Sequence, residues 1–325
     1  MIRHRRRVGY VRDLTDSDGG PPCARRTTPS IQPIGKSERP SGIVDDDQLY
    51  RSAMPYITAS DGVRLHYEIV GSGSPLVLHL GAGGDSELWR AAGYIEALAA
   101  EHRCILFDHR GHGSSDHPTG IADHHIDRYV ADVVALCDQL RLERITFYGW
   151  SNGLIVGLKL AAEQPALVER LILAGAIGRR VDQDQLISAT AERMTGMRER
   201  GWWYLLDDMV AAEPSPIPQW FLDRVVATDQ GPWFAYTQAR PTWGWSPWDA
   251  LPDVGCPALI LVGELEDPDD VMGEVAAVIL EAVRVRVPGK EHINAFLDVH
   301  FVLPIVSDFL GDGPSWPAGD VATDR

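Results

Sequence analysis

Short apolar runs alternate with helical periodicity along most of this chain. The runs predict strands at Tyr56–Ala59, Val63–Val70, Leu76–Leu80, Cys104–Phe107, Ile145–Tyr148, Leu171–Ala174, Ala258–Val262 and Val283–Val287. The periodic segments predict helices at Leu88–Ala100, Ile126–Leu140, Leu154–Glu163, Val271–Glu281 and Ala295–Leu310. This alternation predicts an α/β fold in which a mostly parallel central sheet carries helices on both faces. Ligands of such sheets bind beyond the carboxyl ends of the strands, so the turns that follow strands should hold the functional residues.

The same pattern indicates where the folded core begins and ends. Residues 1–53 contain many Arg, Pro, Ser and Gly and few large apolar side chains, so we expect a disordered N-terminal arm. We expect the α/β core at residues 54–176 and 253–311, and a flexible tail at residues 312–325.

Residues 177–252 depart from the alternation. They are too many for a simple loop, and helical spacing at Gln183–Arg200 and Gln219–Val226 predicts an inserted helical lid. Most of the tryptophans of the chain fall here, namely Trp202, Trp203, Trp220, Trp233, Trp243, Trp245 and Trp248. Such aromatics either pack a lid against its core or line an apolar pocket for a bulky acyl group, and the sequence leaves both roles open.

Composition and charge restrict the classes of partner. The chain has 325 residues, 45% hydrophobic and 23% charged, as is ordinary for a soluble globular protein. Its net charge of −16 argues against nucleic acid and anionic membranes as partners, because both need a basic face. Four scattered cysteines fit no metal-ligand spacing and indicate reduced thiols. No apolar stretch has the length of a signal-peptide core or a membrane span, so we expect a cytoplasmic protein.

The strongest chemical signal is a G-x-S-x-G motif formed by Gly149, Ser151 and Gly153. It lies directly between a predicted strand and a predicted helix. A serine at such a sharp, strained turn projects its hydroxyl above the sheet edge, and the flanking glycines let strand and helix approach closely. The amide groups and positive dipole end of the helix then face the reacting oxygen. The motif therefore indicates a nucleophilic serine.

Further motifs accompany this turn in a characteristic order. Four segments look like motifs of the α/β-hydrolase superfamily: Leu80–Gly84 (H-G-x-x-G turn), Asp108–Ser115 (D-x-R-G-x-G-x-S loop), Cys256–Gly263 (strand before the acid) and Pro288–His292 (histidine loop). The chain thus resembles this superfamily from about residue 54 to residue 310. The resemblance implies an α/β-hydrolase fold and the triad order serine, acid, histidine.

Ser151 needs a general base, and His292 is the candidate because imidazole titrates near neutral pH. A carboxylate must in turn orient this imidazole and stabilise its charged form. The spacing of the family favours Glu266, whereas its usual residue type favours Asp267. Both remain candidates, with Asp267 preferred.

An oxyanion hole requires two preorganised donors. The resemblance assigns this role to the backbone amides of Asn152 and Ala82. The chain departs from the family pattern here, since Leu80 occupies the position where a histidine is frequent and His79 precedes it.

Together these features predict a serine hydrolase that cleaves a small, hydrophobic ester or lactone through an acyl-enzyme. An amide or an activated carbon–carbon bond also fits the scaffold. Two alternatives remain, a cofactor-free oxygenase or perhydrolase-like enzyme that uses a His–acid dyad, and a non-catalytic receptor for a small ligand. No cofactor and no metal are expected, because the glycine-rich turns complete neither G-x-G-x-x-G nor a P-loop. The sequence does not distinguish a monomer from a homo-oligomer.

Overall fold

A computed structural model of the protein describes residues 55–311 and 319–320. The expected N-terminal arm lies outside the described residues, as does the expected tail except for Gly319–Asp320. These two residues form a short strand, so the expectation of a flexible tail does not hold for them. Every helix in the described ranges is too short or too polar to cross a lipid bilayer.

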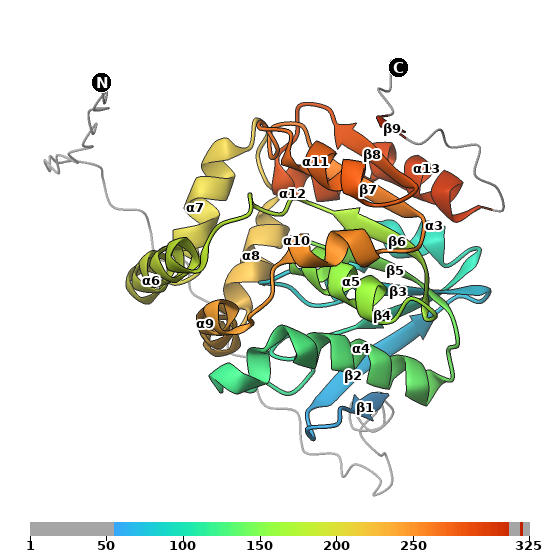
Figure 1. Ribbon diagram of the computed structural model, residues 1–325, viewed down its shortest axis with the longest axis horizontal. Coiled ribbons are helices and arrows are strands. Elements are labelled where there is room, and N and C mark those ends of the chain that lie inside the picture. Colours follow the sequence, from blue (N-terminus) through green and yellow to red (C-terminus); the bar gives the residue numbers. More distant parts are fainter. Residues whose placement is uncertain (1–54, 312–318, 321–325) are drawn as a thin grey trace, which may run out of the picture. The chain divides into compact units, whose positions relative to one another are not determined.

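The described strands form one sheet (Figure 1). They are β1 (Tyr56–Thr58), β2 (Arg64–Val70), β3 (Ser74–His79), β4 (His102–Phe107), β5 (Ile145–Trp150), β6 (Val168–Ala174), β7 (Ala258–Gly263), β8 (Ala282–Val287) and β9 (Gly319–Asp320). Their order across the sheet is β1-β2-β4-β3-β5-β6-β7-β8-β9. The pairs β1–β2 and β2–β4 are antiparallel, and all other neighbouring pairs are parallel.

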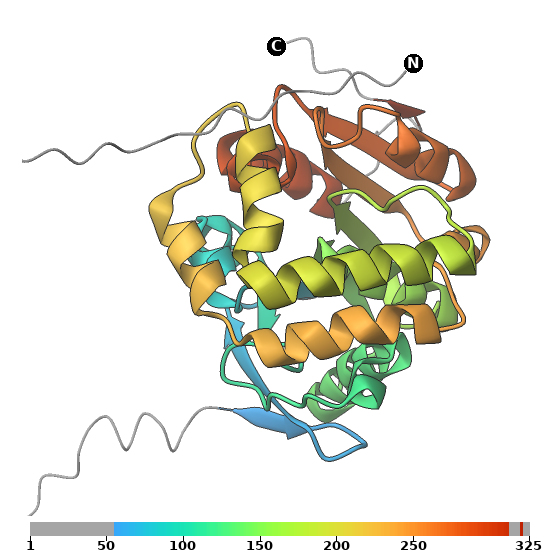
Figure 2. The ribbon, with the colours of Figure 1, turned by 90° about the vertical axis from the view of Figure 1, so that its left-hand side faces the viewer.

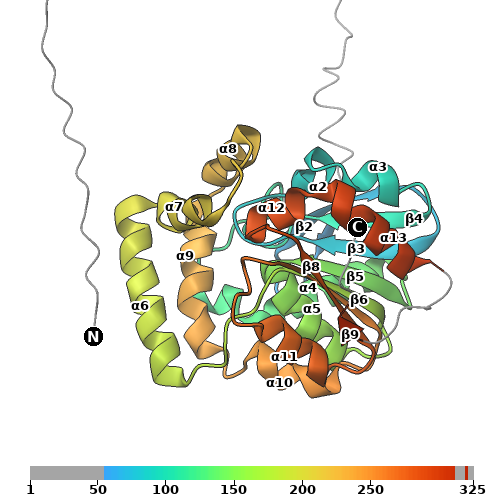
Figure 3. The same ribbon diagram turned by 90° about the horizontal axis from the view of Figure 1, so that it is seen from above.

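Helices cover both faces of this sheet, which confirms the predicted α/β architecture. The α-helices are α2 (Glu87–Ala91), α3 (Tyr94–Leu98), α4 (Ile126–Leu140), α5 (Asn152–Glu163), α6 (Gln183–Arg200), α7 (Trp203–Ala212), α8 (Gln219–Ala227), α9 (Gln230–Ala239), α10 (Pro247–Ala250), α11 (Val271–Val278), α12 (His292–Leu297) and α13 (Val299–Leu310). Three 3₁₀ turns are η1 (Ile121–His124), η2 (Arg240–Thr242) and η3 (Leu251–Asp253). In Figure 3, α2, α3, α12 and α13 lie on one face, and α4, α5, α10 and α11 on the other.

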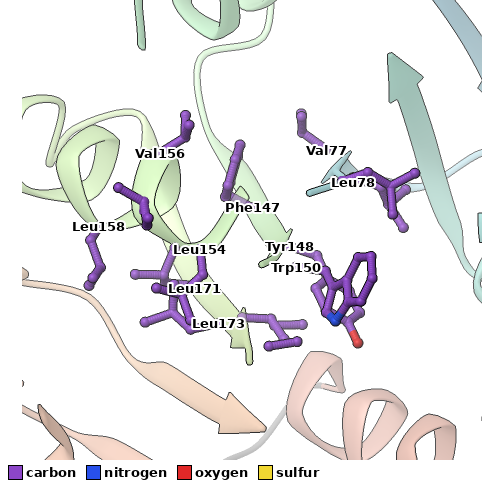
Figure 4. Packing of buried hydrophobic residues seen from close by; sticks show 14 of the residues in the cluster. Val77, Leu78, Phe147, Tyr148, Trp150, Leu154, Val156, Leu158, Leu171 and Leu173 are labelled. Carbon is purple, nitrogen blue, oxygen red and sulfur yellow. The ribbon is translucent and has the colours of Figure 1, made fainter. Parts of the chain in front are cut away.

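The central strands are buried on both sides because they are apolar along their whole length. All residues of β5 and β7 are buried, and Phe147 at the middle of β5 is fully inaccessible. Figure 4 shows Leu154 of α5 gathered with Leu171 and Leu173 of β6 between helix and sheet. Burial of one such side chain contributes about 1.5–3 kcal/mol. The core therefore holds the carboxyl ends of β3, β5 and β7 in fixed relative positions.

Two helices predicted as continuous are interrupted in the structure. The segment predicted at Leu88–Ala100 forms α2 and α3, because Gly93 between them adopts φ 95°, a left-handed conformation that ends the first helix. The segment predicted at Ala295–Leu310 forms α12 and α13, separated by Asp298 with a non-helical ψ of 60°. Apolar periodicity continues through single-residue breaks of this kind and does not reveal them.

Between β6 and β7 the chain forms the helical insertion, residues 177–252. It contains four longer helices, α6 to α9, and the short α10, and only the regions of α6 and α8 were predicted. Helices α6 and α9 lie side by side (Figure 2), and the four helices gather at one end of the sheet (Figure 3). Residues of the insertion line the cavity next to Ser151, so this end is the one where β5 terminates.

Candidate active site

Ser151 occupies the turn between β5 and α5, as predicted. Its backbone has φ 59° and ψ −116°, a strained conformation for a residue with a side chain. The flanking glycines are required by packing, because a Cβ at Gly149 would overlap the carbonyl of Gly153. A Cβ at Gly153 would in turn overlap the carbonyl of His79. The strained turn predicted from the motif is thus confirmed, and it directs the serine out of the sheet.

His292 begins α12, and its imidazole contacts Glu266 in the loop after β7. The distance from His292 Nδ1 to Glu266 Oε1 is 2.6 Å. Both side chains are largely buried, with 16% and 10% of their surfaces exposed. Trp150 stacks on the imidazole at 4.9 Å between ring centroids. The ring is therefore held by a hydrogen bond at its edge and by an aromatic plane on its face.

Each member of this pair shifts the pKa of the other. Burial acts to raise the pKa of Glu266, but the charge and hydrogen bond of His292 and the amides of Ala176 and Gly263 outweigh it, so the net pKa is lowered. Burial acts to lower the pKa of His292, but the charge and hydrogen bond of Glu266 outweigh it, so the net pKa is raised. The pair therefore favours an ionised Glu266 and stabilises the cationic form of His292.

Asp267 is turned away from the imidazole. Its two carboxylate oxygens accept hydrogen bonds from the amides of Val271 (2.7 Å) and Met272 (2.8 Å) at the start of α11. Only 3% of this residue is exposed. The preference for Asp267 as the partner of His292 is therefore not supported by the geometry, because its oxygens satisfy a helix terminus. Glu266, the candidate favoured by spacing, lies at the imidazole.

A cavity of about 350 Å³ brings the candidate residues together. Its lining includes Ala82, Ser151, Asn152 and His292 from the core. The opposite wall comes from the helical insertion and includes Arg193, Trp202, Tyr204, Leu206, Met209 and Phe221. Of the tryptophans in the insertion, Trp202 and Trp233 line this cavity, while Trp243 is buried and donates to the carbonyl of His124.

Two unpaired backbone amides border this cavity. Within residues 55–311, the amide N–H of Ala82 and that of Asn152 have no protein acceptor. Gly81 keeps the first of them close to the serine, because a Cβ at this position would overlap the Ser151 side chain. Two free donors next to one hydroxyl form a position where an anionic oxygen could be stabilised.

A buried histidine holds the turn that carries Ala82. The amide of Gly83 donates to His112 Nε2 at 3.2 Å, which requires a neutral imidazole. Burial lowers the pKa of His112 to about 4, so this acceptor is present at neutral pH. The neighbouring Asp85 accepts two hydrogen bonds from Arg224 of α8, at 2.8 and 3.1 Å. The turn is therefore fixed from the core and from the insertion.

Sequence reasoning missed the role of Glu213, which follows α7. Its Oε1 accepts from the amides of Ile293 and Asn294, both at 2.9 Å, and so caps the helix that His292 begins. Asn294 Nδ2 also donates to the carbonyl of Ser215 at 2.7 Å. No local motif could reveal these contacts, since about eighty positions separate the partners along the chain. The insertion thereby fixes the histidine loop.

The buried histidines near the site make no metal centre. Among the described residues, no group of three or more His, Cys, Asp or Glu side chains is arranged to hold a metal ion. His79 and His109 stack at 4.8 Å, and His109 lies 3.8 Å from His112 between ring centroids. Burial lowers the pKa of all three, so at neutral pH their imidazoles are uncharged.

Known proteins share this sequence pattern and fold. A family model described as alpha/beta hydrolase fold matches residues 74–235. A protein from Azorhizobium caulinodans with the name "Putative carbamate hydrolase RutD" is 36% identical over 126 residues, which are 39% of this chain and 46% of that protein. The chain thus spans less than half the length of this curated relative.

Solved structures match over more of the chain. A hydrolase from Pseudomonas aeruginosa is 25% identical with a TM-score of 0.67, covering 80% of this chain and 99% of its own. The enol-lactonase from Burkholderia xenovorans is 26% identical with a TM-score of 0.67, covering 79% of this chain and 100% of its own. The match of the family model, the sheet order and these similarities together show that the chain belongs to the α/β-hydrolase superfamily.

Proposed function

We propose that the protein is a serine hydrolase that cleaves a small ester or lactone through an acyl-enzyme. One observation carries the proposal. A serine on a strained turn, an imidazole bound to a buried carboxylate, and two backbone amides without an acceptor in residues 55–311 all border the same cavity. The enol-lactonase and the hydrolase to which the chain is similar support this class of reaction.

In the proposed first step, Ser151 Oγ attacks the carbonyl carbon of the substrate. His292 Nδ1 is engaged by Glu266, so Nε2 is the nitrogen that accepts the serine proton. The amides of Ala82 and Asn152 stabilise the negative oxygen of the tetrahedral intermediate. The imidazolium then donates its proton to the leaving oxygen, and the acyl group remains on Ser151.

Hydrolysis of the acyl-enzyme repeats these roles with water. His292 Nε2 accepts a proton from water, which attacks the acyl carbon, and the imidazolium returns this proton to Ser151 Oγ as the acid departs. Glu266 remains ionised throughout and holds the ring in place. Its several hydrogen bonds favour that state, since they stabilise the carboxylate and not the acid.

In this proposal the helical insertion acts as the lid of the site. It provides the wall opposite Ser151, and it contacts the core through Glu213 at the histidine loop and Arg224 at the Ala82 turn. The aromatic and aliphatic side chains of this wall exclude water and strengthen the electrostatic interactions in the cavity. The mixture of aromatic and aliphatic lining residues suits a hydrophobic acyl or leaving group.

The test is intact mass after treatment with a fluorophosphonate probe. We expect one adduct on the wild type, mapped to Ser151, and no adduct on Ser151→Ala. His292→Ala should label at least a hundredfold more slowly, because the serine loses its general base. Wild-type protein that is folded by circular dichroism and yet gives no adduct would overturn the proposal. Oxygen consumption and ligand-binding assays would then examine the dyad oxygenase and the receptor.

A further inference from the structure

Arg193 is a cation in the wall of the candidate site. It belongs to α6 of the helical insertion and is half-buried. It lines the 350 Å³ cavity together with Ser151 and His292. It also lines a second cavity of about 310 Å³ that shares Ser151 and Asn152 with the first. Arg193 therefore lines both of the cavities that include the candidate nucleophile.

In the described part of the chain, Arg193 has no partner for its charge. Among the residues that the structure describes, its side chain makes no hydrogen bond and no ion pair. Arg240 of η2, which lines the second cavity, likewise has no acidic partner in the described ranges and stacks over Trp243 at 5.9 Å. Burial and then the charge of Arg240 lower the pKa of Arg193, which remains a cation because a guanidinium deprotonates only at very high pH.

The two cavities contain a surplus of positive charge. Asp208, the single carboxylate among their lining residues, is exposed in α7. Arg179 also lines the second cavity, but it pairs with Asp269 and Glu274. A half-buried cation without a counter-ion is costly, and an anionic ligand would remove that cost. The whole chain carries a net charge of −16, so the positive charge at these cavities is opposite in sign to the net charge of the protein.

We propose that the substrate carries a carboxylate, which Arg193 binds with the assistance of Arg240 while the scissile carbonyl lies at Ser151. A guanidinium matches a carboxylate with two parallel hydrogen bonds, and such charge-assisted pairs are strong where water is excluded. The carboxylate orients the acyl chain across the cavity, so one end of the substrate is recognised and the other reacts. This inference rests on the proposed hydrolase function and narrows its substrate class to esters or lactones of dicarboxylic acids.

The test compares two nearly isosteric esters, the 4-nitrophenyl monoester of adipic acid and that of adipamic acid. They differ in one charge, so kcat/KM should favour the adipate ester by about 10- to 100-fold. Arg193→Gln should abolish this preference mainly through KM for the charged ester, and Arg193→Lys should retain part of it. Arg198→Gln is the matched control, because Arg198 is exposed on the same helix and lines neither cavity. Equal kcat/KM for the two esters in the wild type, or equal losses for both in Arg193→Gln, would overturn the inference.

A second experiment measures binding without catalysis, and it distinguishes failure of this inference from failure of the proposed function. Titration calorimetry of Ser151→Ala with adipate and with adipamide measures recognition without turnover. We expect adipate to bind at least tenfold more tightly than adipamide, and Arg193→Gln in the same background to remove the difference. Preferential adipate binding together with unlabelled Ser151 would overturn the hydrolase proposal and support the anion site. Hydrolysis without preference for charge in either assay would overturn the anion site alone.

Discussion

Two arginines are withdrawn from solvent, one in the core and one in the helical insertion, and they differ in whether other residues compensate the charge of the guanidinium. Arg110, in the loop after β4, is 1% exposed and binds Asp132 through two hydrogen bonds of 2.6 and 2.7 Å. It also donates to Asp61 and to the carbonyl of Asp123. Burial acts to lower the pKa of Arg110, but these partners outweigh it and the net pKa is raised. Arg193 is half-buried and has none of this compensation among the described residues.

The charge of Arg110 therefore stabilises the fold, whereas the charge of Arg193 is available to a ligand. Each guanidinium nitrogen of Arg110 donates to an acceptor within the chain, and its bonds to Asp132 connect the loop after β4 to α4. Arg193, by contrast, lines the cavity of Ser151 and has no hydrogen-bond partner among the described residues. Charged groups that are uncompensated in a folded protein concentrate at functional sites, where the protein gives up some stability for binding.

Glu266 and Asp267 show the same contrast between a charge that faces the candidate site and one that serves folding. Replacing Glu266 should have the largest effect of the predictions made here. Glu266→Gln removes the charge beside His292, so we expect kcat to fall about 10³- to 10⁴-fold with a small change in stability. Activity needs neutral His292 and rises with pH through its pKa. Because the Glu266 carboxylate raises that pKa, its loss should move the acid limb of the pH–rate profile to lower pH. Steady-state kinetics across pH measure both effects.

Asp267→Asn is the control for this prediction. Its carboxylate caps α11 and does not touch the imidazole, so the melting temperature should fall while the acid limb stays in place. A folded Glu266→Gln enzyme with wild-type turnover, or loss of turnover confined to Asp267→Asn, would show that the triad has been assigned to the wrong acid.

Removing a partner from the core arginine should destabilise the protein strongly. Asp132→Ala leaves Arg110 buried without its principal counter-ion, and we expect a loss of about 3–5 kcal/mol in the free energy of unfolding. Arg193→Met removes an uncompensated charge, so its free energy of unfolding should stay within about 0.5 kcal/mol of the wild type or rise. Urea denaturation of both variants provides the comparison. Equal destabilisation would mean that Arg193 has a structural partner after all.

Acid should weaken the core through its buried histidines. Burial lowers the pKa of His79 and of His112 to about 4 in the folded protein, whereas an unfolded histidine titrates near 6.5. Their neutral forms contribute full stability above pH 6.5, and this contribution is lost progressively as the pH falls toward 4. A difference of this size corresponds to about 3 kcal/mol for each group. The urea midpoint should therefore decrease steeply across this range.

His112→Gln provides the control for the acid effect. Glutamine keeps an acceptor near the Gly83 amide but does not titrate, so the slope of stability against pH should be shallower by one proton. An unchanged slope would assign the acid sensitivity to other groups. Asp61 and Asp108 have lowered pKa values, so the stability that their carboxylates contribute is lost only as the pH falls below their ordinary pKa of 3.8.

The contact between insertion and core should give the smallest effect. Asp85 and Arg224 form a bidentate pair, but their side chains are 27% and 37% exposed. Solvent screening limits such a pair to about 0–1 kcal/mol, so Asp85→Asn should barely change the urea midpoint. Since the pair lies beside the Ala82 turn, KM should rise about two- to fivefold. A KM unchanged at low and high salt would show that this contact does not hold the site closed.

The sequence by itself determined the features that depend on neighbouring residues. Continuous apolar runs specify strands buried on both faces, and the glycines around Ser151 specify the strained turn at the end of β5, because few other residues permit so close an approach. These local signals were sufficient for the fold, for the position of Ser151 and for the order of the candidate residues. They also reduced the candidate acid to two adjacent positions.

Only the tertiary structure decided which carboxylate contacts the imidazole of His292. Glu266 and Asp267 are chemically alike and adjacent, and the choice between them depends on the direction in which the loop after β7 turns each side chain. Glu213 and Arg193 reach the site from an insertion whose amphipathic helices could pack in several ways. The sequence carries no local record of such contacts, because they arise from packing between segments far apart in the chain, where burial and charge are settled only when the fold is complete.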